Sequence, residues 1–267
     1  MSEDNIISFR GTQIFEKEAE ILKELESLTN KKFSPVKEVK YFTKMGFSTL
    51  NRRVSGIGLF KCGLTKLPES INILKSLQSL VLYENDLKTL PNSLEDLKSL
   101  QILNLRWTNL KTLPESITKL KLLQILNLEE NELRTLPESF GNLSSLKSLH
   151  LFYNKIRKLP ESIGKLSSLE ELYLDDNNLK KFPDSIKNLN SLKDLSLFNN
   201  KIKKLPNSIG NLKNLEFLNL SDNELKKLPE SIIKLTKLKR LMLGGNKFTK
   251  LPESIKILEK RGVNIVI

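Results

Sequence analysis

The segment Leu169–Ser191, with the sequence LEELYLDDNNLKKFPDSIKNLNS, contains the pattern that decides the fold. Leucines equivalent to Leu169 recur every 23 residues, without an insertion or a deletion, at positions 77, 100, 123, 146, 192, 215 and 238. A less regular copy of the unit begins at Val54, so nine complete units span residues 54–260. A fixed period of this length is the signature of a solenoid, in which each unit packs only on its neighbours.

Each position of the unit has a physical role. The alternation of Leu172 and Leu174 predicts a short half-buried strand, and stacked units would pair such strands in a parallel sheet. Asn177 lies where the chain turns inward, so its carboxamide can pair with backbone groups that the turn leaves without partners. Pro183 suits the first turn of a helix, and the S-I-x-x-L that follows predicts one helical turn. Because helical turns need more room than strands, we expect the stack to curve with its sheet on the concave side.

The unit L-x-x-L-x-L-x-x-N-x-L-x-x-L-P-x-S-I-x-x-L-x-x resembles the 23-residue LPxxI class of leucine-rich repeats. This class is found in leptospiral and archaeal proteins and in eukaryotic scaffolds and Ras-pathway adaptors. The resemblance covers residues 54–260 and implies an α/β solenoid, a horseshoe with a concave parallel β-sheet and short 3-10 or α-helical turns on its convex side. It also implies protein binding on the concave face, and analogy to the adaptors makes a small GTPase a candidate partner.

Residues 1–53 lack the repeat and are expected to form an N-terminal cap. Apolar residues spaced by three or four predict an amphipathic helix over about 13–29. Val36–Phe42 and Phe47–Leu50 are interpreted as short strands, and residues 51–53 would turn the second strand back onto the first repeat.

Residues 261–267 form a strand-like stub that is out of register with the repeat leucines. Such a strand leaves an uncovered sheet edge. The edge either pairs with another chain or is tolerated because it is short.

Composition argues against most kinds of chemistry. Nucleotide-binding, zinc-protease and C-x-x-C motifs are absent, and a single histidine rules out multi-histidine metal sites. The sole cysteine, Cys62, occupies the inward asparagine position, which predicts a buried structural thiol. We therefore expect a protein that is not an enzyme and needs no cofactor or metal.

The same composition bears on location. No apolar run is long enough to cross a bilayer, and the first residues show no secretory signal. A lone cysteine cannot form an internal disulfide, which fits a reducing compartment. These features predict a cytoplasmic protein.

The residues that flank the strand leucines are expected to face the concave side and bind a protein partner. These columns collect the only tryptophan, the only histidine and three of the four tyrosines, residue types that often dominate interface energetics. Phe152 and Tyr153 lie between two acidic pairs, which suits a partner that is basic and apolar at its contact. The candidate contact residues are Tyr83, Arg106, Trp107, Glu129, Glu130, His150, Phe152, Tyr153, Tyr173, Asp175, Asp176, Phe198 and Phe217.

The net charge of +13 supports an alternative function, polyanion binding to nucleic acid or an anionic membrane. Much of this charge comes from the two residues before each Leu-Pro pair, which would form a lysine-rich flank. An acidic row three residues further along would partly screen it, and no aromatic side chain in the flank could stack on bases. Nucleic acid is therefore disfavoured as a partner. The flank consists of Lys66, Lys88, Lys111, Arg134, Arg157, Lys158, Lys180, Lys181, Lys203, Lys204, Lys226, Lys227 and Lys250.

Overall fold

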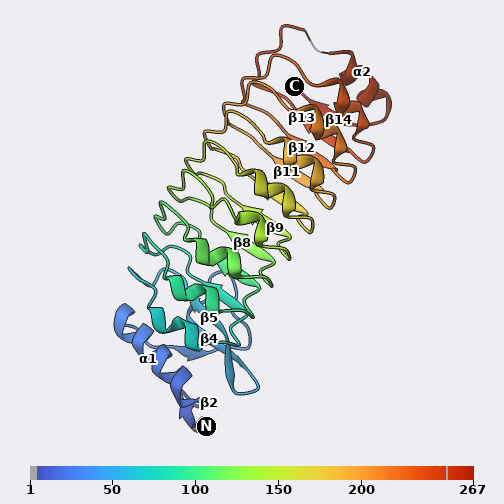
Figure 1. The fold of residues 1–267 in the computed structure, drawn as a ribbon. Helices are drawn as coiled ribbons and strands as arrows, with labels where there is room; N and C mark the ends of the chain where they lie inside the picture. Colours follow the sequence, from blue (N-terminus) through green and yellow to red (C-terminus); the bar gives the residue numbers. More distant parts are fainter. Residues whose placement is uncertain (1–4, 251) are drawn as a thin grey trace. The chain divides into compact units, whose positions relative to one another are not determined.

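The computed structural model describes residues 5–250 and 252–267. The chain forms two compact units, of which the first extends to Asn131 and the second runs from Glu132 to Ile267. In both units short strands alternate with short helices on the opposite side of each repeat (Figure 1). No helix within the described ranges is long and apolar enough to cross a membrane.

The first unit contains one sheet in the order β3-β4-β5-β6-β7-β8 and a separate hairpin of β1 and β2. Strand β4 pairs antiparallel with β5, and every later pairing in this unit is parallel, with partners 23 residues apart from β5 to β8. The elements are β1 (Ile6–Phe9), β2 (Thr12–Phe15), α1 (Glu16–Thr29), β3 (Ser34–Pro35), β4 (Lys44–Leu50), β5 (Arg53–Leu59), η1 (Glu69–Ile73), β6 (Ser79–Val81), η2 (Asn92–Asp96), β7 (Ile102–Asn104), η3 (Glu115–Lys119) and β8 (Ile125–Asn127).

The second unit contains a parallel sheet in the order β9-β10-β11-β12-β13-β14. Its 3-10 helices lie between successive strands, so the predicted α/β solenoid with an open parallel sheet is confirmed. The elements are η4 (Phe140–Asn142), β9 (Ser148–His150), η5 (Glu161–Lys165), β10 (Glu171–Tyr173), η6 (Asp184–Asn188), β11 (Asp194–Ser196), η7 (Asn207–Asn211), β12 (Phe217–Asn219), η8 (Glu230–Lys234), β13 (Arg240–Met242), α2 (Glu253–Lys260) and β14 (Asn264–Val266).

The inward asparagines hold each turn to the next, as the sequence predicts. Asn131 Oδ1 accepts hydrogen bonds from the backbone N–H groups of Thr108 and Leu110 at 3.2 and 2.9 Å. Its Nδ2 donates to the carbonyls of Leu105 and Leu128 at 2.8 and 3.0 Å. The carboxamide therefore satisfies buried backbone groups of two successive repeats, which is where an unpaired group would be most costly.

The N-terminal helix begins later than predicted. Residues 13–15 lie in strand β2, which pairs with β1 through a turn at Arg10 and Gly11, and the helix α1 starts only at Glu16. Ile14 is fully buried in that hairpin, so pairing with β1 outweighs the helical spacing of the apolar residues. The buried carboxylate of Glu18 in α1 accepts a hydrogen bond of 2.6 Å from Val54 N, which ties the helix to the first repeat.

The prediction of a strand over Val36–Phe42 is wrong. This segment is a loop, in which Lys40 N donates to Thr43 Oγ1 at 2.7 Å and Thr43 N donates to Lys40 O at 3.0 Å. Reciprocal bonds of this kind close a local turn, which competes with strand pairing. The expected turn at residues 51–53 is present. Asn51 and Arg52 both have left-handed backbones, and the turn lets β4 pair with β5.

The last strand is displaced by one residue, as its sequence suggests. Ile265 in β14 pairs with Leu241 in β13, a separation of 24 residues. The preceding segment is the α-helix α2, where the other repeats of this unit have 3-10 helices. Gly262, at φ 84°, then turns the chain into β14. The two alternatives for this edge, pairing with another chain and tolerance because the strand is short, both stay predictions.

Candidate protein-binding face

The sheet face is formed by the third, fifth, seventh and eighth residues of each repeat, which flank the buried leucines. In the first unit a loop of the same chain lies on this face. Tyr83 is only 8% exposed, because the Phe60 ring stacks on it at 5.0 Å and the rings of Tyr41 and Phe42 lie 5.2 and 6.0 Å away. Tyr83 is therefore a packing residue and offers little surface to a partner.

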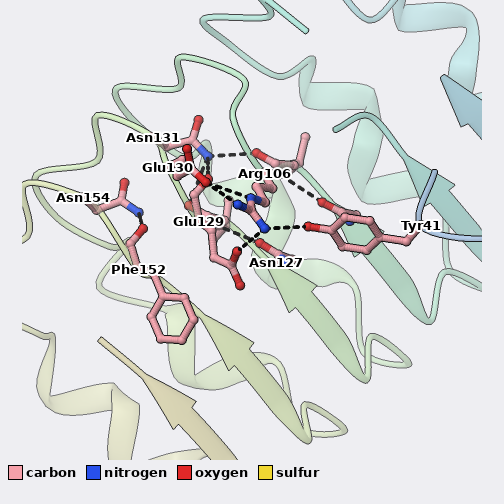
Figure 2. A network of polar contacts seen from close by, with 11 residues as sticks. Tyr41, Arg106, Asn127, Glu129, Glu130, Asn131, Phe152 and Asn154 are labelled. Atoms are coloured by element: carbon pink, nitrogen blue, oxygen red, sulfur yellow. Dashed lines mark hydrogen bonds and ion pairs between the residues drawn. The ribbon is translucent and has the colours of Figure 1, made fainter. Parts of the chain in front are cut away.

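Arg106 lies at the centre of a polar network (Figure 2). Its Nη1 is 3.1 Å from Glu129 Oε2 and donates to Tyr41 Oη at 3.2 Å. Its Nε donates to Glu130 Oε1 at 3.0 Å, and the guanidinium lies 5.3 Å from the centre of the Tyr83 ring. Burial alone would lower the pKa of Arg106, but the bonds to Tyr41 and Glu130 raise it above its ordinary value. These predicted contact residues therefore neutralise one another.

The second unit brings three predicted residues into a ring cluster. Tyr173 in β10 lies opposite His150 in β9, with ring centres 5.1 Å apart. Phe152 lies 5.4 Å from Tyr173 and 6.0 Å from His150. All three side chains are partly exposed, so they form a surface cluster and not a buried core.

Three carboxylates, those of Glu171, Asp175 and Asp194, act electrostatically on Tyr173. Glu171 in β10 pairs in register with Asp194 in β11, on the same strands that carry Tyr173 and its neighbours. Burial, followed by the charges of Glu171, Asp194 and Asp175, raises the pKa of Tyr173 to about 12. We name the six residues His150, Phe152, Glu171, Tyr173, Asp175 and Asp194 the aromatic–acidic patch.

Among the acids of this patch, Glu171 has His150 as a neighbour, with Oε2 and Nε2 4.0 Å apart. In the portion of the second unit that the structure describes, no lysine or arginine forms an ion pair with Glu171, Asp175 or Asp194. Burial raises the pKa of Asp175 despite hydrogen bonds to its Oδ1 from Ser196 Oγ and, at 3.0 Å, from Phe198 N. Burial and the charges of Glu171 and Glu216 likewise raise the pKa of Asp194.

Sequence reasoning missed Ser148, Glu171 and Asp194. Ser148 Oγ lies 2.7 Å from His150 Nε2 and donates to Glu171 Oε2 at 2.7 Å, so it joins the imidazole to the acid. The signal was available, since Ser148, Glu171 and Asp194 all occupy the third position of their repeats.

The other predicted residues lie outside this patch. Asp176 Oδ1 accepts a bond from Asn199 Nδ2 at 2.5 Å. Phe198 and Phe217 are half-buried, and neither ring contacts the cluster within the described part of the chain.

The eighth residue of every repeat has a left-handed backbone, which the sequence analysis did not anticipate. Asn199 and Gly245 suit this conformation, whereas Trp107 at φ 51° and Tyr153 at φ 49° are bulky residues that rarely adopt it. Both rings are exposed, Trp107 by 48% and Tyr153 by 60%. A strained backbone lowers the stability of the folded chain, and an exposed ring contributes little burial to offset that cost. We therefore interpret Trp107 and Tyr153 as candidate contact residues.

The lysine-rich flank is interleaved with acids. Lys181 and Lys204 line an open hollow together with Asp184. Lys204 and Lys227 line the next hollow together with Glu230. Positive and negative side chains thus line the same hollows, which agrees with the prediction of a mutually screened flank.

Cys62 occupies the inward position with 2% exposure, and its Sγ lies 3.3 Å from Phe60 O. Burial raises the pKa of its thiol, which opposes reactivity. Among the described residues, no cluster of three or more His, Cys, Asp or Glu side chains could hold a metal ion.

A family model described as a leucine-rich repeat region matches residues 92–182 and 175–260, more than half of the chain. No curated protein matches the sequence. A solved leucine-rich-repeat protein of Leptospira interrogans is 30% identical, covering 80% of this chain and 72% of that one, with a TM-score of 0.42. The crystal structure of a TDR receptor is 28% identical with a TM-score of 0.61; the match covers 79% of this chain and only 42% of the receptor chain. The chain belongs to the leucine-rich-repeat family, whose members are generally non-enzymatic protein-interaction scaffolds.

Proposed function

We propose that this protein is a non-enzymatic scaffold that binds a protein partner on the sheet face of its second unit. The observation that carries the proposal is the aromatic–acidic patch, in which partly exposed rings lie close to carboxylates that form no ion pair with a lysine or arginine in the described part of the second unit. Tyr153, strained and 60% exposed, extends the aromatic surface beside it. Aromatic anchors of this kind are enriched among residues that dominate binding free energy.

We also propose a repeat class and a location for this protein. The 23-residue spacing and the Leu-Pro pairs favour the LPxxI class, and a chain with one buried cysteine suits the cytoplasm. A small GTPase stays a family analogy that no side chain on this face supports. Polyanion binding is less favoured because acids line the same hollows as the flank lysines.

Affinity capture from the native cell, followed by binding measurements with the purified partner, tests this proposal. We expect Phe152→Ala and Tyr153→Ala each to weaken binding about thirtyfold, since truncating a central aromatic residue costs about 2 kcal/mol. The control combines Lys180→Ala, Lys203→Ala and Lys226→Ala on the flank and should bind like the wild type. If the lysine variant loses the partner and the aromatic variants keep it, the binding face is wrongly chosen.

A further inference from the structure

The first unit shows how this sheet face holds a guanidinium. Arg106 lies at the seventh position of its repeat, beside the ring of Tyr83 from the preceding repeat. Its nitrogens pair with Glu129 and Glu130, the seventh and eighth residues of the following repeat. A ring on one side and two carboxylates on the other therefore form an arginine site that the chain fills itself.

The second unit repeats the carboxylates without the cation. Phe152 occupies the position equivalent to Arg106, 46 residues later in the 23-residue repeat. Asp175 and Asp176 occupy the positions equivalent to Glu129 and Glu130. The internal guanidinium is thus replaced by a ring, which clusters with Tyr173 at 5.4 Å.

The nearest lysines are engaged elsewhere. Lys193 Nζ pairs with Glu170 at 2.5 Å, and Lys239 Nζ pairs with Glu216 at 2.6 Å. Glu171 and Asp194 face one another across neighbouring strands, and in the described ranges neither forms an ion pair with a lysine or arginine, although His150 Nε2 lies 4.0 Å from Glu171 Oε2. Like charges in register repel, so a cation supplied from outside would be stabilised there.

We infer that the aromatic–acidic patch binds the guanidinium of an arginine side chain presented by the protein partner. This inference rests on the proposed function. A guanidinium stacks on aromatic rings and donates to two carboxylates at once, which the compact ammonium of lysine cannot do equally well. The bound arginine supplies in the second unit the positive charge that Arg106 supplies in the first, with Glu171 and Asp194 as its carboxylate partners.

The test uses the full chain and the Nα-acetylated amides of arginine, lysine and citrulline as probes, followed by amide NMR shifts. Citrulline has nearly the shape of arginine without its charge. We expect the arginine probe to shift signals of residues 150–152 and 171–175 with a millimolar Kd, and the other probes to bind more weakly.

A matched pair of double variants locates the site. Glu171→Gln with Asp194→Asn should weaken the arginine probe about fivefold to tenfold, as removal of two exposed ion pairs predicts. Asp184→Asn with Glu230→Gln changes the charge equally on the flank and should leave Kd unchanged.

Several outcomes overturn the inference: no shifts, shifts outside the patch, or equal binding of citrulline or lysine. Loss of probe binding in the flank variant would do the same. A captured partner that depends on Phe152 and Tyr153, together with an arginine probe that does not bind, would leave the proposed function standing and remove only this inference.

Discussion

The sheet faces of the two units are built from the same repeat, yet they differ in what covers them. In the first unit a loop of the chain packs on Tyr83, and Arg106 neutralises Glu129 and Glu130. In the second unit the rings around Tyr173 are partly exposed and the neighbouring acids have no lysine or arginine partner among the described residues. The repeat therefore sets the positions of these side chains, and the residue at the seventh position decides whether the neighbouring acids have an arginine partner within the chain.

The largest effect should come from breaking the network of the first unit. Arg106→Met leaves the buried carboxylate of Glu129 without its guanidinium, and because Arg106 itself is only partly buried we expect a loss of about 2 kcal/mol of unfolding free energy. Urea unfolding measures it. The matched control in the second unit is Lys239→Met, which breaks an exposed pair with Glu216 and should cost less than about 1 kcal/mol. Equal losses would show that the two faces do not differ in this way.

A smaller effect of opposite sign is expected at the strained aromatic residues. Tyr153→Asn places a residue that tolerates a positive φ at a position where Asn199 already adopts it. We expect a gain of about 1 kcal/mol in thermal or urea unfolding, because left-handed backbone costs about that much for a bulky residue. Binding of the captured partner should weaken in the same variant. A variant that is both less stable and fully able to bind would assign Tyr153 to folding.

The smallest effects should distinguish the units by their pH dependence. Burial and neighbouring acids raise the pKa of Asp194. Its contribution to the free energy of unfolding is therefore fully present below its unfolded pKa of about 4, and this contribution is lost as the pH rises through the pKa of the folded state. Burial alone would raise the pKa of Glu26, but bonds from Arg10, Phe33 and Lys32 lower it. The contribution of Glu26 is therefore present above its unfolded pKa and lost as pH falls through the folded value.

Urea unfolding of Asp194→Asn and Glu26→Gln between about pH 4 and pH 7 checks both signs. Relative to the wild type, Asp194→Asn should become more stable as pH rises. Glu26→Gln should become less stable over the same range. Parallel curves for the two variants would contradict the assigned environments.

The fold was predictable from the sequence because the buried leucines and the inward asparagines, such as Asn131, recur at the same positions of each repeat and contact only the adjacent repeats. Backbone geometry at the eighth position could have been inferred from Asn199 and Gly245, which favour a left-handed conformation. The loop that covers Tyr83 could not, since its contacts join residues far apart in the sequence. Local spacing also misplaced the start of α1, where pairing between β1 and β2 fixes residues 13–15 as a strand.

The sequence predicted which residues lie on the sheet face. It did not predict which of them form ion pairs with one another. Spacing alone placed Arg106 and Phe152 on the same face as equivalent residues. It could not show that Arg106 has internal acidic partners, because that depends on side-chain conformations across repeats.

The most direct test of the difference between the two faces is the affinity of the arginine probe for Phe152→Arg. This substitution gives the second unit the residue that Arg106 provides in the first, with Asp175 and Asp176 in place of Glu129 and Glu130. Phe152→Leu controls for loss of the ring. We predict that Phe152→Arg folds and no longer binds the probe, whereas Phe152→Leu binds it more weakly than the wild type but measurably. Unchanged probe binding by Phe152→Arg would contradict the account.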